Sequence, residues 1–331
     1  MAGRSGGLLA WLLPTTSSAV LLLLSLTPCT GAPDYSAMRH CPFPAPDTLQ
    51  PCSCLVDTQY NTHLVCSLQQ DFTTETLEML NRAYRCKKKV SFIDINLNGN
   101  GWISDLNSEL TGEFEMGSFK LRNFSSFSGD IPAGAFNNSK FSMKEFILDS
   151  ATDGSGNNTI QTGAFTNLVN LRKVEFGNSF SKINTSSFVN LPRLEMLNIG
   201  DETLELIESG AFHNIGLTKI DFSQQRLKEI PPRAFKDFPN AVEIDLSGNQ
   251  ITRLSEDSFS NLPKVVSLEL SNNSIEDISN TLSKLTNQNL QVDLSNNIIE
   301  FIMEESFKPY IETSKGKVNL FGNPIQVKLR N

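Results

Sequence analysis

Histidine, tryptophan and clustered basic residues are scarce in this chain. Its 331 residues include 3 His and 2 Trp, and the formal net charge is −8. The sequence contains no metalloprotease, phosphate-loop or dinucleotide-binding motif, which argues against a catalytic centre. The acidic balance argues against a nucleic-acid ligand, because neutralising phosphates requires clustered Lys and Arg. We therefore expect no enzymatic activity, no metal and no cofactor.

The N-terminal segment is arranged like a secretory signal peptide. Arg4 precedes the apolar stretches Leu8–Leu13 and Ala19–Leu26, and the small residues Thr30 to Ala32 follow. The second stretch is much shorter than the ~20 apolar residues that span a bilayer. We therefore predict that residues 1–32 are removed, rather than kept as a signal anchor. Cleavage a few residues earlier, near Cys29 to Gly31, is the alternative.

The rest of the sequence predicts a secreted, extracellular glycoprotein. No later apolar run is long enough to cross a membrane, and the chain ends without the hydrophobic tail of a lipid anchor. N-glycosylation motifs are consistent with this extracellular location. They begin at Asn123, Asn137, Asn157, Asn184 and Asn272.

The segment 33–89 is rich in cysteine and is expected to cap the N-terminal end. Cys41, Cys52, Cys54 and Cys66 have the spacing C-x10-C-x-C-x11-C. Outside the cell such a cluster indicates two disulfides. Cys52 and Cys54 point to the same face of an extended chain, so we expect the pairs Cys41–Cys54 and Cys52–Cys66.

Two further readings of the cysteines stay open. His40 and His63 lie near the cluster, which allows a zinc site, although secretion favours disulfides. Cys86 has no obvious partner. It is a free thiol, an intermolecular bridge, or half of a pair whose other member lies outside this sequence.

The region 90–323 is built from repeats. Phe165, Phe188, Phe212, Phe235 and Phe259 follow one another at intervals of 23, 24, 23 and 24 residues. The shared template is L-x-x-L-x-L-x-x-N-x-I-x-x-I-x-x-x-x-F-x-x-L, which is a leucine-rich repeat. About nine turns of ~24 residues are expected. The turns near 99–117 and 151–158 look like insertions, and 324–331 forms a short tail.

The template predicts the shape of each turn. The L-x-L pair places two apolar side chains inward from a short strand, and stacked turns bury them against their neighbours. The return segment that starts at each "AF" is expected to be a short helical or irregular turn. The predicted fold is thus an α/β repeat solenoid, a leucine-rich-repeat horseshoe with a parallel concave β-sheet. It has a disulfide-rich N-terminal cap and lacks a C-terminal cysteine cap.

A polar position after each strand is expected to bond the backbone of neighbouring turns from inside the coil. Asparagine holds it at Asn100, Asn249, Asn273, Asn297 and Asn323. Ser179, Glu202 and Gln225 replace it in the middle repeats. A buried Glu202 would be costly, so we expect its repeat to be distorted.

The outward positions of the strands form two columns on the concave face. These candidate binding residues are Glu175, Asn198, Asp221, Asp245, Glu269 and Asp293 in one column, and Lys173, Lys219 and Glu243 in the other. Carboxylates on strands ~4.8 Å apart repel unless a cation meets them. The columns therefore form either a docking strip for a basic partner or simply the acidic position common in this repeat type.

Both ends of the mature chain resemble a particular family. The segments Cys41-Pro42, Pro51-Cys52-Ser53-Cys54 and Val65-Cys66-Ser67, together with the last repeat around Phe307 and Gly322-Asn323-Pro324-Ile325, resemble the oplophorus-luciferin 2-monooxygenase non-catalytic subunit family of arthropods. The resemblance implies an extracellular subunit without oxygenase activity that accompanies a small catalytic chain. Members of the family usually continue from G-N-P into a cysteine-rich cap, whereas this sequence runs into Gln326–Asn331.

The expected function is that of a secreted, non-catalytic scaffold that binds a protein partner. The family resemblance implies that this partner is a small catalytic chain, as in a luciferase-like monooxygenase. Recognition in innate immunity or in the extracellular matrix is an alternative, and a truncated receptor ectodomain is another. The uncapped end or Cys86 would allow a dimer.

Overall fold

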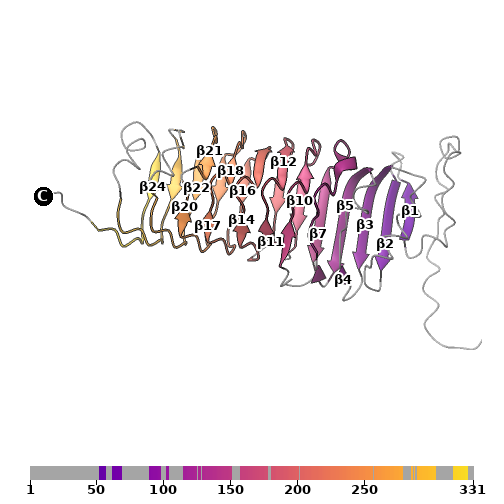
Figure 1. Ribbon diagram of the computed structural model, residues 1–331, viewed down its shortest axis with the longest axis horizontal. Coiled ribbons are helices and arrows are strands. Elements are labelled where there is room, and N and C mark those ends of the chain that lie inside the picture. Colours follow the sequence, from indigo (N-terminus) through magenta and orange to yellow (C-terminus); the bar gives the residue numbers. More distant parts are fainter. Residues whose placement is uncertain are drawn as a thin grey trace, which may run out of the picture.

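The computed structural model describes residues 52–56, 62–68, 89–97, 102–103, 115–124, 126–127, 129–150, 157–177, 180–200, 202–255, 257–278, 285, 287, 289–302 and 316–326. Its side chains are described from Met116 onward, apart from 122–128 and 150. The predicted signal peptide, Cys29, Cys41 and Cys86 lie outside these residues. Successive turns of the chain follow one another along the long axis, from β1 to β24 (Figure 1).

Each complete turn contributes strands to three separate sheets. The first sheet carries the L-x-L positions and has the order β1-β2-β3-β5-β7-β10-β13, followed by a second run in the order β16-β19-β22-β23-β24. The bounds of the first run are β1 (Cys52–Val56), β2 (Thr62–Leu68), β3 (Lys89–Leu97), β5 (Glu115–Phe124), β7 (Glu145–Ser150), β10 (Lys173–Phe176) and β13 (Met196–Asn198). The bounds of the second run are β16 (Lys219–Asp221), β19 (Glu243–Asp245), β22 (Ser267–Glu269), β23 (Gln291–Asp293) and β24 (Lys317–Asn319). All these pairs are parallel except β1–β2.

The return segments that begin at each "AF" are strands, which corrects the expectation of helical or irregular turns. They form a parallel sheet in the order β21-β18-β15-β12-β9. Their bounds are β9 (Phe165–Thr166), β12 (Phe188–Leu191), β15 (Phe212–Ile215), β18 (Phe235–Lys236) and β21 (Phe259–Ser260). Each phenylalanine pairs with its equivalent in the next turn, and this regular stacking favours an extended backbone.

Shorter strands close the third side of the coil. Their bounds are β8 (Asn158–Ile160), β11 (Phe180–Ile183), β14 (Leu206–Ile207), β17 (Glu229–Ile230) and β20 (Arg253–Leu254), with a further pair of β4 (Trp102–Ile103) and β6 (Ser126–Phe127). Within the described part of the chain, helix is limited to the 3-10 turn η2 (Asn137–Ser139). Gly117 and Asn158, which the sequence placed in insertions, lie in β5 and β8.

Aromatic rings stack along the inside of the coil. The rings of Phe165 and Phe188 lie 5.0 Å apart and nearly parallel, and the stack continues through Phe212, Phe235 and Phe259 at 5.3, 6.0 and 5.8 Å. Each such pair adds about 0.5–1.5 kcal/mol beyond the area it buries. The interval of 23 or 24 residues between phenylalanines in the sequence therefore brings equivalent rings of adjacent turns into contact.

Buried amide side chains join each turn to the one before it. The Oδ1 of Asn273 accepts the N–H of Ile251 at 3.0 Å, and its Nδ2 donates to the carbonyls of Leu246 and Leu270 at 3.0 and 3.1 Å. Asn249, Asn297 and Asn323 make equivalent bonds. The predicted role of this position is confirmed for these residues, whereas Asn100 and Ser179 lie outside the described part.

The turn with Glu202 is irregular, as expected. Glu202 is exposed with a φ of 56°, and the first sheet is interrupted here, between β13 and β16. Gln225 of the next turn occupies the asparagine position and makes comparable bonds to the turn of Glu202. Its Oε1 accepts the N–H of Leu204 at 3.0 Å, and its Nε2 donates to the carbonyl of Gly200 at 2.6 Å. Gln225 thus takes the role that asparagine has in the later turns, as the sequence predicts.

Replacing Asn273 with alanine should leave one N–H and two carbonyls of adjacent turns without partners. We expect Asn273→Ala to lower the free energy of unfolding by roughly 2–3 kcal/mol, because a buried unpaired polar group costs about 1–3 kcal/mol. Urea denaturation monitored by circular dichroism measures this. The control Asn240→Ala removes an amide whose side chain contacts Lys264 at the surface and should change stability by less than ~0.5 kcal/mol. Equal effects in the two variants would contradict the assignment.

Candidate functional site

The outward side chains of the first sheet form the columns expected from the sequence. The strand register places Lys173 beside Met196, and Glu175 beside Asn198. After the interruption it places Asp221, Asp245, Glu269 and Asp293 in one column, beside a second column that starts at Lys219 and Glu243. We call the outward surface of β16, β19, β22 and β23 the sheet face. All nine predicted binding residues lie in these columns, either on the sheet face or on the neighbouring β10 and β13.

The aspartates of the sheet face have a structural role. The Oδ1 of Asp221, of Asp245 and of Asp293 each accepts the N–H of the residue two positions later, at 3.1, 3.0 and 2.8 Å. Asn198 makes the same bond to Gly200 at 2.8 Å. These contacts turn the chain at the end of each strand, so the recurrence of Asp at this position follows from the turn itself.

Two lysines form ion pairs with acidic side chains on β10, β16 and β19. Lys219 Nζ lies 2.8 Å from Glu243 Oε1 and 3.4 Å from Asp221 Oδ2, and Lys173 Nζ lies 2.7 Å from Glu175 Oε2. The hydrogen bond to Glu243 raises the pKa of Lys219 above its ordinary value, with a further contribution from Asp221. Lys219 thus offsets part of the charge of Asp221 and Glu243.

Burial and hydrogen bonding act in opposite directions on Asp221 and Asp293. Burial raises the pKa of Asp221, but bonds from Ser223 and the Lys219 ammonium outweigh it, so the pKa lies below its ordinary value. Burial likewise raises the pKa of Asp293, and bonds from Ser295 and Asn319 lower it overall. Both carboxyl groups are therefore held in the ionised state.

Asp245 and Glu269 keep an uncompensated charge. They lie opposite each other on adjacent strands. One oxygen of Asp245 accepts from Ser247 at 2.6 Å, and one of Glu269 accepts from Ser267 at 2.9 Å. Among the described residues, neither carboxylate forms an ion pair with a Lys or Arg. Two like charges at this separation repel, so a cationic group of a partner would be favoured between them.

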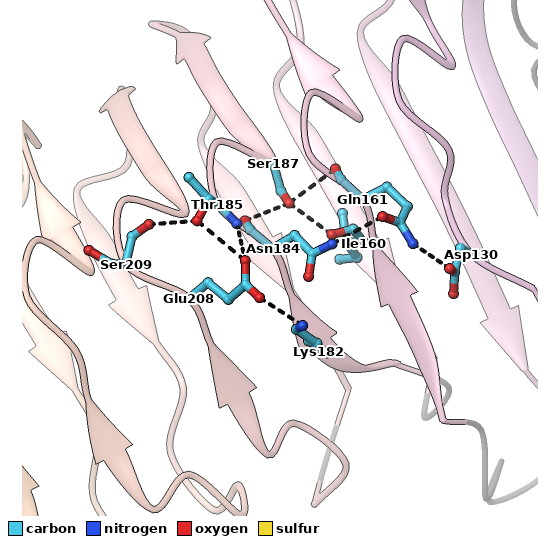
Figure 2. Close-up of polar contacts among 9 residues, drawn as sticks. All are labelled: Asp130, Ile160, Gln161, Lys182, Asn184, Thr185, Ser187, Glu208 and Ser209. Carbon is cyan, nitrogen blue, oxygen red and sulfur yellow. Dashed lines mark hydrogen bonds and ion pairs between the residues drawn. The ribbon is translucent and has the colours of Figure 1, made fainter.

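A second polar cluster lies at the corner between β8, β11 and the β9–β12 sheet. Figure 2 shows Asp130, Gln161 and Asn184 in a row, with Gln161 donating to Asp130 and Asn184 Nδ2 donating to Gln161 Oε1 at 3.0 Å. The hydroxyl of Ser187 contacts the carbonyls of Ile160, Gln161 and Asn184 at 2.8, 3.1 and 2.8 Å. Its position ties the backbone of adjacent turns together, and no described His, Asp or Glu contacts it as a base would.

The same cluster continues to Glu208. One oxygen of Glu208 lies 2.7 Å from Lys182 Nζ, and the other accepts the N–H of Thr185 at 2.9 Å (Figure 2). The bond from Lys182 is the largest cause that lowers the pKa of Glu208. These groups bind one another, so the cluster is a structural clamp between turns.

Sequence reasoning missed a groove on the β15–β18–β21 side of the coil. It has a volume of about 320 Å³ and is lined by His213, Asn214, Asp237, Pro239, Asn261 and Pro263. The signal for it was present, because Asn follows the repeated phenylalanine by two positions at Asn167, Asn190, Asn214 and Asn261. The spacing of the phenylalanines predicts the period of the repeat, whereas the Asn two positions later indicates a second row of equivalent side chains.

Three of the cysteines, Cys52, Cys54 and Cys66, have a described backbone. β1 and β2 pair antiparallel, with Cys52 opposite Cys66 and Cys54 opposite Leu64. This register is compatible with the predicted Cys52–Cys66 disulfide. Both disulfides stay predictions, as does the role of Cys86.

No group of three or more His, Cys, Asp or Glu side chains that could hold a metal ion occurs in the part of the chain with described positions. In the same part, no helix is long and apolar enough to cross a membrane.

The stacked turns, the buried asparagines and the L-x-L sheet define the chain as a leucine-rich-repeat solenoid. The family model for the BspA-type leucine-rich-repeat region matches residues 129–225, 158–284 and 195–312, which together cover more than half of the 331 residues. The chain therefore belongs to the BspA-type leucine-rich-repeat family. A search of curated proteins finds no match.

Two solved structures have a similar fold. The first is the complex of Toll and Spatzle from Drosophila, with 20% identity and a TM-score of 0.51 over 83% of this chain and 31% of that chain. The second is the TLR13 complex with ssRNA13, with 20% identity and a TM-score of 0.51 over 80% of this chain and 37% of that chain. This chain thus spans about a third of the length of each. At such identity the likeness establishes the fold alone.

Lowering the pH should destabilise the protein through its paired carboxylates. The pKa values of Glu145, Glu208, Asp221 and Asp293 are lowered in the folded state. Their stabilising contribution is complete above the ordinary values of 4.5 and 3.8. It is lost as the pH falls through the lowered folded-state values. We expect a steady melting temperature from about pH 7 to 5 and a progressive fall below about pH 4.5, measured by circular dichroism.

The variant Asp221→Asn/Asp293→Asn tests this cause. Asparagine keeps the turn contact, as Asn198 does natively, but it cannot titrate. The fall in melting temperature at acid pH should be shallower than in the unsubstituted protein. An identical acid profile would rule out these two carboxylates as contributors.

The sequons should differ in their use. Asn157 is exposed, and its Nδ2 has no partner among the described residues. The Nδ2 of Asn184 donates to Gln161, and its Oδ1 is buried, so a glycan there would break the row in Figure 2. After expression in a eukaryotic secretory host, peptide mapping should find Asn157 glycosylated and Asn184 largely unmodified. Full occupancy of Asn184 in folded protein would contradict the geometry.

Proposed function

We propose that this protein is a secreted, non-catalytic scaffold that holds a protein partner on the sheet face. The observation that carries the proposal is the pair Asp245 and Glu269, which lie opposite each other without a described counter-ion. On the same face Asp221 and Glu243 share an ion pair with Lys219. The partner would place a Lys or Arg side chain between the two carboxylates.

The shape of the sheet face suits a protein surface. Its strands are short and parallel, and β19, β22 and β23 are each paired on both sides, so the backbone around Asp245 and Glu269 stays in place when a partner binds. A rigid surface loses little conformational entropy on association. Charge complementarity across the interface would speed the encounter and select the partner.

The chemistry of the sheet face favours a protein over a nucleic acid. The TLR13 structure contains single-stranded RNA and the Toll structure contains Spatzle. Here the net charge is −8 and the sheet face carries uncompensated carboxylates, which would repel phosphates. A protein ligand, as in the Toll complex, therefore fits the proposal better.

Narrower versions of the proposal concern the identity of the partner. The resemblance of the cysteine cap and last repeat to the luciferin monooxygenase non-catalytic subunit family suggests a small catalytic chain. A microbial or matrix protein is the alternative, and in that case the chain acts in recognition. Native co-purification distinguishes them, since the first version requires a stoichiometric second chain from the same tissue.

Removing the two charges should weaken partner binding. The variant Asp245→Asn/Glu269→Gln keeps the size of both side chains and the turn contact of residue 245. We expect about tenfold weaker binding, or ~1.4 kcal/mol, to the partner captured from the native secretion, measured by surface plasmon resonance. High salt should weaken the unsubstituted complex in the same direction.

The matched control is Glu205→Gln/Glu229→Gln. It makes the same change in net charge on a different side of the coil, where both residues are exposed. The control should bind like the unsubstituted protein. Equal losses in both variants would indicate a general charge effect, and no loss in either would refute docking on the sheet face.

A further inference from the structure

A second row of amide side chains runs along the outside of the β9–β12–β15–β18–β21 sheet. Asn190 Nδ2 donates to Asn167 Oδ1 at 2.8 Å, and Asn214 Nδ2 donates to Asn190 Oδ1 at 3.0 Å. Asn261 donates in the same way to Asp237. These five residues have φ between 54° and 60°, a left-handed conformation that Asn and Asp tolerate better than most residues. We call them the amide row.

The amide row is interrupted between Asn214 and Asp237. A carboxylate has no N–H, so Asp237 cannot donate to Asn214 as the pattern requires. Instead, Asp237 Oδ2 lies 2.9 Å from Nδ1 of His213 and 3.8 Å from Nζ of Lys236. Among the described residues, the Oδ1 of Asn214 therefore receives no hydrogen bond.

The groove of about 320 Å³ lies at this interruption. His213, Asn214 and Asn261 are exposed along it, and so are the rings of Pro239 and Pro263. The prolines are equivalent residues of successive turns, so their apolar rings lie in a row beside the amides. The residues that line the groove lie in or just after β15, β18 and β21.

The charges of the groove favour an uncharged ligand. Asp237 is already matched by His213 and Lys236. A phosphate or sulfate would meet the Asp237 carboxylate, and a metal cation would have to displace both basic groups. The charge balance thus excludes the simplest ionic ligands.

The backbone around the groove disfavours a peptide strand. Peptides commonly bind a sheet by adding to an unpaired edge. Here β18 is paired on both sides, with β15 and β21, and the N–H of Asp237 is bonded to the carbonyl of Ser260. The N–H and C=O groups of β18 are therefore not available to pair with an extended peptide.

The side chains that remain match a sugar. The amide groups of Asn214 and Asn261 and the free ring nitrogen of His213 offer both donors and acceptors, as vicinal hydroxyl groups do. The exposed faces of Pro239 and Pro263 provide apolar surface for the C–H face of a sugar ring. The volume lies at the small end of the range for ligand pockets, about 300–1,000 Å³, which fits a short saccharide.

We propose that this groove binds an uncharged saccharide through Asn214, Asn261 and His213, with the sugar ring packed on Pro239 and Pro263. This site is distinct from the sheet face and does not depend on the function proposed for it. Asp237 acts as a positioning residue, because it orients the His213 ring and keeps the amide row open.

The test uses Asp237→Asn, which should repair the amide row. An asparagine at 237 is able to donate to Asn214, so the variant should be at least as stable as the unsubstituted protein, while the Oδ1 of Asn214 is no longer available to a ligand. The probes are cellotetraose, maltotetraose and laminaritetraose, each added to the full secreted protein after removal of its own N-glycans. Saturation-transfer NMR should detect binding of at least one probe, and Asp237→Asn should weaken it about tenfold or more.

Two comparisons keep the result specific. Lys264→Gln, which removes an exposed charge next to Pro263, should leave saccharide binding unchanged, and His213→Ala should weaken it. The proposal is overturned if none of the three probes binds, or if folded Asp237→Asn binds as tightly as the unsubstituted protein. Tighter binding of inorganic phosphate than of any sugar would also overturn it.

Discussion

The amide side chain buried at each turn is the contact on which the rest of this solenoid depends. Asn249, Asn273 and Asn297 each hold one N–H of the preceding turn and carbonyls of two turns. Without them the backbone would turn inside an apolar coil with unpaired polar groups, which is costly. Because each amide spans two turns, it also sets the register in which the strands and the phenylalanine rings stack.

The same register creates the surfaces that a partner can use. Side chains with equivalent positions in successive turns lie beside one another. A different residue at one position therefore changes the contacts of the equivalent residues in the adjacent turns. Asp237 shows this in the amide row, where loss of one N–H donor coincides with a groove. Lys219 shows it on the sheet face, where one cation serves two acids and the following pair, Asp245 and Glu269, has none.

Carboxylates in this protein combine structural and binding roles within a single side chain. One oxygen of Asp245 terminates its strand through Ser247, and the other remains available on the sheet face. The sequence allows two interpretations of the acidic column, as a property of the repeat and as a docking strip, and the second stays a prediction. The turn contact explains why the residue type recurs, whereas Asp245 and Glu269 lie opposite each other and neither forms an ion pair with a described Lys or Arg.

The sequence by itself determined the repeat period, the inward positions, the asparagine turn and the columns of the sheet face, because these depend on spacing along the chain. It also located the irregular turn at Glu202, since a buried charge there is unfavourable. The tertiary structure alone decided the extended form of the "AF" segments and the ion pairs of Lys219 with Asp221 and Glu243. It also decided the hydrogen bond between Asn184 and Gln161, and the groove at Asp237. Each of these depends on which side chain of the neighbouring turn, some 23 or 24 residues away in the repeat, comes within hydrogen-bonding or stacking distance.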